Sequence, residues 1–189
     1  MFEEILAALS KVLQKRSIPY MVIGGQAVLL YGEPRVTRDI DITLGVDADH
    51  LDELLEVARD LSLRTLPDEV RKFVQQTMVL PCLHEDTGIR VDFIFSFTPY
   101  ETQAIQRSNR IQIQGTEVCF ASPEDVIIHK IFAGRPRDME DVRSILLRND
   151  NVDIHYIQSW LDEFDISTEE KGFRKRLEEL QAHLRNSNT

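Results

Sequence analysis

The chain has 189 residues, the size of one domain or of one domain with a helical extension, so it is long enough to bury a sizeable core. It carries 22 Lys and Arg against 32 Asp and Glu, which gives a net charge of −10. This acidity disfavours broad, nonspecific nucleic-acid binding, which depends on cations that neutralise phosphates. A local basic groove stays open, formed by Arg35, Arg38, Arg135 and Arg137.

The chain carries no signature of a membrane or secreted protein. No stretch approaches the roughly 20 apolar residues of a membrane span, and the first residues, Met1 to Glu4, are acidic where a secretory signal would be basic. Cys82 and Cys119 fall in apolar runs and are expected to be buried free thiols. We therefore expect a cytoplasmic protein with no membrane partner.

Residues up to about 121 alternate between helical and strand patterns. Periodicity and turn residues predict helices at residues 2–16, 26–31, after Asp47, at 68–76 and from Pro99, and strands at 20–23, 39–44, 77–83, 89–96, 110–114 and 117–121. The tight polar link between residues 77–83 and 89–96 predicts an antiparallel hairpin. Gly32 is expected to close the second helix in the left-handed conformation.

From Ser122 onward the pattern is helical throughout. Helices are expected at residues 123–133, 138–148, 153–164 and 168–186. We therefore predict an α+β fold with two parts. Residues 1–121 form a mixed α/β core, and residues 122–189 form a helical C-terminal part packed on it.

The candidate chemistry begins with paired carboxylates. Side chains two apart on a strand leave from one face, so Asp39 and Asp41 point the same way while Ile40 points into the core. Asp92 lies in an equally apolar strand and joins the pair if the two strands are neighbours. Carboxylates about 5 Å apart repel by roughly 3 kcal/mol at an effective dielectric of 20, which Mg²⁺ or Mn²⁺ would offset. The alternative for Asp-x-Asp is an exposed strand face.

Gly24 and Gly25 stand where a strand turns into a helix. Backbone N–H groups and a helix N-terminus can approach an anion closely at such a turn, so the pair is a candidate phosphate cradle. Taken alone, the two glycines are more typical of a simple tight turn. Their occurrence together with the three acids is far more specific.

These residues resemble the nucleotidyltransferase superfamily related to DNA polymerase β. Its pattern is a glycine pair, a short helix, apolar-Asp-apolar-Asp-apolar and a later apolar-Asp-apolar. The chain matches it with Ile23-Gly24-Gly25, Asp39-Ile40-Asp41-Ile42 and Val91-Asp92-Phe93. The resemblance implies a nucleotidyltransferase fold with a helical extension, in which Asp39 and Asp41 are metal ligands and Asp92 bridges the metals or accepts the proton of the attacking hydroxyl.

A second segment, from Lys130 to Asp141, narrows the resemblance. It is similar to the Lys…Ala…Arg…Asp…Asp segment of abortive-infection AbiEii-type toxin nucleotidyltransferases, as is Arg35-Val36-Thr37-Arg38 before the acids. The resemblance implies that Lys130 and Arg38 contact the nucleotide and that Asp138 organises the site. The alternatives are a surface Lys130 paired with nearby acids and an Asp138 that caps the helix after Pro136.

The sequence as a whole predicts a metal-dependent enzyme. It would transfer a nucleoside monophosphate from a nucleoside triphosphate to a hydroxyl acceptor, and the resemblance adds tRNA or a protein as acceptor and an antitoxin as partner. Two alternatives remain open, a nucleotide-binding module without turnover and an interaction protein of a toxin–antitoxin system.

Overall fold

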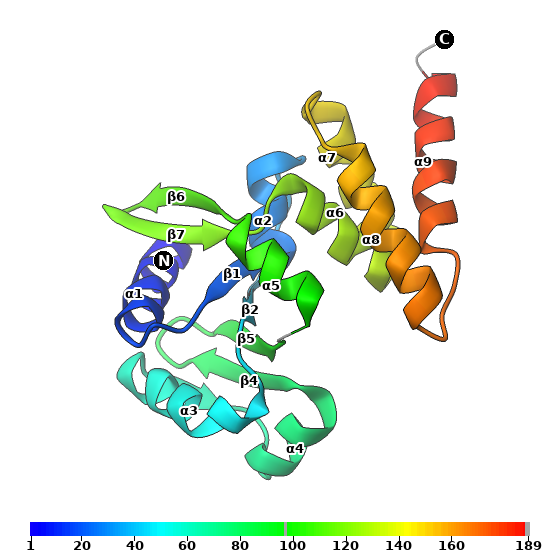
Figure 1. The fold of residues 1–189 in the computed structure, drawn as a ribbon. Coiled ribbons are helices and arrows are strands. Elements are labelled where there is room, and N and C mark those ends of the chain that lie inside the picture. The colour runs from blue at the N-terminus through cyan, green and yellow to red at the C-terminus, as the bar shows by residue number, and fades with distance from the viewer. Residues whose placement is uncertain (97, 188–189) are drawn as a thin grey trace. The chain divides into compact units, whose positions relative to one another are not determined.

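The computed structural model describes residues 1–96 and 98–187 (Figure 1). Residue 97 and the last two residues of the predicted helical part lie outside the described residues. The helices are α1 Phe2–Lys15, α2 Gly24–Tyr31, η1 Ala48–His50, α3 Leu51–Asp60, α4 Val70–Thr77, α5 Pro99–Gln106, α6 Pro123–Ala133, α7 Pro136–Arg148, α8 Ile154–Ser167 and α9 Phe173–Ser187. The strands are β1 Tyr20–Ile23, β2 Asp39–Leu44, β3 Leu63–Thr65, β4 Val79–His84, β5 Ile89–Phe95, β6 Asn109–Ile113 and β7 Thr116–Phe120.

The strands form one mixed sheet in the order β3-β4-β5-β2-β1-β7-β6. The pairs β1–β7 and β2–β5 are parallel, and the other neighbours are antiparallel. The predicted mixed sheet followed by helices is confirmed, and so is the hairpin, which is formed by β4 and β5. None of the helices in the described part of the chain is long and apolar enough to cross a membrane.

Three details differ from the sequence predictions. Strand β3 escaped prediction because it has only three residues, of which Leu63 alone is buried. Gly32 is absent from the positive-φ residues of the described chain. A Cβ there would lie 2.5 Å from the hydroxyl oxygen of Ser144, so close packing requires this glycine. Cys82 is buried as expected, whereas Cys119 is only half-buried.

The chain divides into two compact units. The sheet unit contains residues Met1–Gln26 and Val36–Ala121, and the helical unit contains Ala27–Arg35 and the chain from Ser122 onward. In the sheet unit, α1 packs on β6 and β7, α3 on β3 and α4 on β4. The central strands β1, β2 and β5 bury Val22, Ile40, Ile42 and Phe93 almost completely.

The helical unit is built around α6, which contacts α7, α8 and α9. An aromatic cluster extends from the buried Phe173 to the exposed Phe132, whose rings stack with centroids 5.0 Å apart, and Phe164 meets both edge-on. Ser122 caps α6 by accepting a hydrogen bond from the backbone N–H of Asp125, and Pro123 starts the helix, as the sequence predicted.

Candidate active site of the sheet unit

Four neighbouring strands form a row that contains two of the predicted site residues, Asp41 and Asp92. Across β4, β5, β2 and β1, the register partners are Pro81, Asp92, Asp41 and Ile23. Neighbouring strands lie about 4.8 Å apart, so the row spans about 14 Å. The condition for Asp92 to join Asp39 and Asp41, that their strands are neighbours, is therefore met.

The alternation of buried and accessible residues in β2 and β5 places the carboxylates on one face of the sheet. In β2, Ile40 and Ile42 are fully buried whereas Asp39 is exposed and Asp41 half-buried. In β5, Val91 and Phe93 are fully buried, whereas Arg90 is exposed and Asp92 is half-buried on the opposite face. The apolar residues hold both strands in the core, so the carboxylates are displayed on a rigid surface.

Gly24 follows the last residue of β1 and lies directly against Asp41. Its φ is +63°, and a Cβ at this position would lie 2.0 Å from Oδ2 of Asp41. An L side chain is therefore excluded twice, by the left-handed backbone and by the carboxylate. Gly24 also begins α2, and Gly25, in the first turn of that helix, is buried. The glycine pair and the acids thus form one constellation.

Arg90 supplies a positive charge to this surface, and the sequence reasoning did not assign it a role. Its Nε donates a hydrogen bond to Oδ1 of Asp92 over 2.7 Å. The pKa of Arg90 is raised, first by that hydrogen bond and then by the charges of Asp92, Asp39 and Asp41. All three acids therefore act on one guanidinium. The available signal was the spacing, since residues 90 and 92 share a strand face.

No group of three or more His, Cys, Asp or Glu side chains in the described ranges is arranged to hold a metal ion. The donor set nevertheless fits a hard divalent cation, because Asp41 and Asp92 are adjacent carboxylates and Asp39 lies on the same strand face as Asp41. The guanidinium of Arg90 neutralises part of the charge of Asp92, so it would compete with a metal ion for that carboxylate. Arg38, which the sequence predicted to contact the nucleotide, is exposed immediately before β2.

Burial and charge also act on Cys82, which pairs with Val91 in the register of β4 and β5. Burial of the thiol, together with the charge of Asp92, raises its pKa to about 12. The thiol therefore stays protonated at neutral pH and acts as a small apolar side chain.

The other two predicted site residues, Lys130 and Asp138, belong to the helical unit. Lys130 is about nine-tenths buried, and its Nζ lies 2.8 Å from Asp138 and 2.9 Å from Asp141. Arg35 completes the cluster with Nε 2.9 Å and Nη2 3.0 Å from the two carboxylate oxygens of Asp141. The surface-residue alternative for Lys130 is wrong, although its pairing with nearby acids is confirmed.

Asp138 has a helix-capping role, but at the third helical position of α7 and not as the expected N-cap. Arg135 is the N-cap of α7, and the carboxylate of Asp138, at the third helical position, accepts hydrogen bonds from the backbone N–H and Nε of Arg135. Burial alone would raise the pKa of Asp138, but the hydrogen bonds from Lys130 and Arg135 outweigh it and the pKa is lowered. The carboxylate is therefore held ionised.

Comparison with known proteins shows the family of the chain. Residues 1–185 match the family described as "Nucleotidyltransferase of unknown function (DUF6036)". The chain therefore belongs to this nucleotidyltransferase family. Among curated proteins, no sequence matches.

Solved structures of the same fold include three nucleotidyltransferases or nucleotidyltransferase-like proteins. The antibiotic-resistance factor ANT(2'')-Ia is 15% identical, with 98% of this chain and 96% of that chain covered and a TM-score of 0.58. An antigenic nucleotidyltransferase-like protein from Paracoccidioides brasiliensis is 18% identical over 86% of each chain, with a TM-score of 0.55. The lincosamide antibiotic adenylyltransferase LnuA is 17% identical over 77% and 97%, with a TM-score of 0.53. These similarities establish the nucleotidyltransferase fold.

Proposed function

We propose that the protein is a metal-dependent nucleotidyltransferase, which transfers a nucleoside monophosphate from a nucleoside triphosphate to a hydroxyl group. The observation that carries the proposal is the contact of Gly24 with Asp41, in register with Asp92. A glycine that must lack a side chain beside a carboxylate pair gives phosphates access to the place where a metal would be held. Binding without metal chemistry would not require such a costly arrangement of like charges.

Asp39, Asp41 and Asp92 would hold Mg²⁺ or Mn²⁺ through oxygen ligands. The ion would supply charge neutralisation for the phosphates and the leaving pyrophosphate. The backbone N–H groups at Gly24 and Gly25, at the N-terminus of α2, suit the phosphate oxygens.

Asp92 is the candidate base for the acceptor. As the acceptor oxygen bonds to the α-phosphorus, the bond from that phosphorus to the pyrophosphate oxygen breaks, and the hydroxyl proton passes to Asp92. Asp92 suits this role because its side chain is only 16% exposed and belongs to a strand whose other face is fully buried. A rigid, partly desolvated carboxylate is a more effective base than a mobile solvated one.

The test combines binding with turnover. Thermal unfolding is measured with Mg²⁺ and each nucleoside triphosphate, separately and together, followed by transfer of label from the triphosphate into a cellular extract. We expect stabilisation that needs metal and nucleotide together. Asp41→Asn and Asp92→Asn should each lower transfer at least about 100-fold, whereas Asp86→Asn, in the exposed hairpin turn, should leave it unchanged. No stabilisation and no transfer would reject the proposal.

A module that binds a nucleotide without turnover is the second candidate. The ion pair of Arg90 with Asp92 favours it, because it occupies the carboxylate that would act as base. Stabilisation by nucleotide without any labelled product, together with equal nucleotide affinity in wild type and Asp92→Asn, would support this alternative over the enzyme.

The identity of the acceptor and of a protein partner can also be proposed. The resemblance of residues 130–141 to AbiEii-type toxins favours tRNA or a protein as acceptor and an antitoxin as partner, and it assigns a phosphate contact to Lys130. The described adenylyltransferase activity of LnuA on a lincosamide antibiotic favours a small hydroxylated molecule. Labelled product in the tRNA, protein or small-molecule fraction of the extract decides among them.

A further inference from the structure

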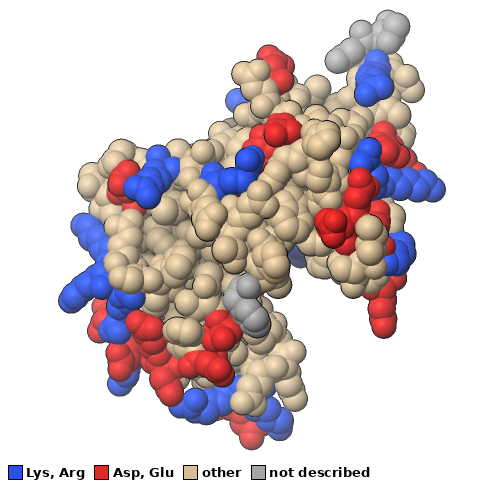
Figure 2. Space-filling model, in the orientation of Figure 1, with Lys and Arg blue, Asp and Glu red and all other residues tan. Residues whose placement is uncertain are grey.

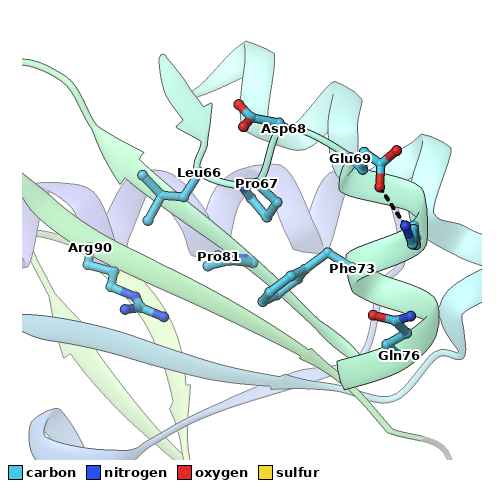
Figure 3. A pocket seen from close by; sticks show the side chains of 9 residues that line it. Leu66, Pro67, Asp68, Glu69, Phe73, Gln76, Pro81 and Arg90 are labelled. Atoms are coloured by element: carbon cyan, nitrogen blue, oxygen red, sulfur yellow. Dashed lines mark hydrogen bonds and ion pairs between the residues drawn. The ribbon is translucent and has the colours of Figure 1, made fainter.

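A cavity of about 730 Å³ opens beside the carboxylates within the sheet unit (Figure 3). Pro81, the register partner of Asp92, lies in its wall, and so does Arg90, which is bonded to Asp92. The cavity therefore begins one strand away from the proposed base.

In the proposed reaction, the cavity lies on the side of the carboxylates from which an acceptor hydroxyl would attack. Gly24 marks the β1 side of Asp41 and Asp92, whereas Pro81 marks the β4 side. In a phosphoryl displacement, the attacking and leaving oxygens lie roughly in line on opposite sides of the phosphorus. With the triphosphate at Gly24, an attacking hydroxyl would come from the side of Pro81, where the cavity lies.

The walls of the cavity combine flat apolar surfaces with a polar rim. Figure 3 shows the ring of Phe73 pointing from α4 into the cavity toward Pro81, with Leu66 and Pro67 beside it. Phe73 is 37% exposed and Leu66 38%, so a ligand would remove apolar surface from water. An aromatic ring opposite proline suits a flat ring, because such surfaces stack at low entropic cost.

The charged groups around the cavity have no excess of cations. Lys72 lies 2.9 Å from Glu69 at the rim, Arg90 is bonded to Asp92, and Asp68 adds one further carboxylate. On the face drawn in Figure 2, the described acidic and basic side chains are interspersed. A polynucleotide backbone needs an excess of cations, whereas the volume is typical of sites for small molecules.

We infer that this cavity is the acceptor site, and that it takes a small molecule carrying a hydroxyl group on a flat, largely apolar ring system. The inference rests on the proposed function. The ring lies against Phe73 and Pro81, and the hydroxyl is directed past Arg90 to Asp92. Gln76, at the end of α4, offers a polar contact at the rim.

The test uses 4-methylumbelliferone, a flat fluorescent phenol, as the binding probe for the full chain. We expect saturable binding that Phe73→Ala weakens about tenfold or more, consistent with the loss of one aromatic contact and its buried area. Gln75→Ala is the matched control, because Gln75 is exposed on the same helix but does not line the cavity. Sorbitol, a hydroxyl compound without a flat ring, and a 20-nucleotide RNA should not displace the probe.

A second measurement separates this inference from the proposed function. In Phe73→Ala, the thermal stabilisation by Mg²⁺ with nucleoside triphosphate should stay as in wild type. Unchanged probe binding in Phe73→Ala, or displacement of the probe by the RNA, would overturn the acceptor site and leave the nucleotidyltransferase proposal intact. Displacement of the probe by the triphosphate would also overturn it, because the cavity would then hold the nucleobase.

Discussion

Gly24 and Asp41 are matched in shape, since the carboxylate of Asp41 occupies the space that a side chain at position 24 would need. The match joins two sequence motifs that are far apart in the chain. Because position 24 is glycine, the first turn of α2 can also accept a backbone conformation that most residues avoid.

Gly24→Ala should therefore damage ligand binding more than stability. The left-handed backbone costs about 1–2 kcal/mol with any L side chain, and the carboxylate of Asp41 must turn away from the methyl group. Gly88→Ala is the control, because Gly88 has a similar φ of +69° and a Cβ added there would meet nothing within 4 Å. Urea unfolding should show the larger loss in Gly24→Ala, because only position 24 adds the clash with Asp41, and stabilisation by metal and nucleotide should disappear only in Gly24→Ala. Retention of that stabilisation would contradict the role of the close contact.

Arg90→Gln should tighten metal binding. The guanidinium and a divalent cation compete for the same carboxylates, and removing one charge at about 5 Å changes the balance by up to about 3 kcal/mol at an effective dielectric of 20. We expect the Kd for Mn²⁺, measured by titration calorimetry, to fall about tenfold or more. Arg64→Gln, which removes an exposed partner of Glu85, should leave it unchanged. Equal affinities in wild type and Arg90→Gln would show that the two cations do not compete.

Lys130→Met should destabilise the helical unit strongly. The substitution leaves Asp138 and Asp141 buried with one cation fewer, and breaking a buried ion pair costs about 3–5 kcal/mol. Lys175→Ala, which removes an exposed pair with Glu179, should cost less than about 1 kcal/mol. Denaturant unfolding of both variants measures the difference, and similar small losses would mean that the buried cluster contributes little.

The pH dependence of stability should report Asp138. Because the pKa of its folded form is lowered from 3.8, its contribution is fully present above the pKa of the unfolded chain. The contribution is lost as the pH falls below 3.8 through the lower folded value. Asp138→Asn should therefore flatten the stability curve in that acidic range. Thermal unfolding between pH 2 and 6 provides the measurement, and an equally steep curve in the variant would assign the acid sensitivity to other groups.

Local sequence patterns predicted most of the fold because β2 and β5, the strands that carry the acids, alternate between buried and accessible residues. Ile40 and Ile42 identified the buried face of β2, and Val91 and Phe93 did the same for β5. Strand β3 is too short to show a period, and its pairing with β4 depends on contacts distant in sequence. The close packing of Gly32 on Ser144 likewise lies outside any local pattern.

The candidate site could be predicted in its acids and not in the partners of its cations. Asp41 and Asp92 are register partners because β2 pairs with β5, the condition on which the predicted carboxylate cluster depended. The ion pair of Arg90 with Asp92 depends on side-chain conformation, and the pair of Arg35 with Asp141 joins residues 106 positions apart. Such ion pairs can be identified only from the folded structure.

The contact of Arg35 with Asp141 has a consequence for protein engineering. Arg35 lies in the short segment that joins α2 to β2, yet it is paired with a residue 106 positions later in the chain. A chimera that exchanges only the contiguous C-terminal stretch with a relative would take Asp141 from one parent and Arg35 from the other. A graft of the helical unit must therefore include Ala27–Arg35.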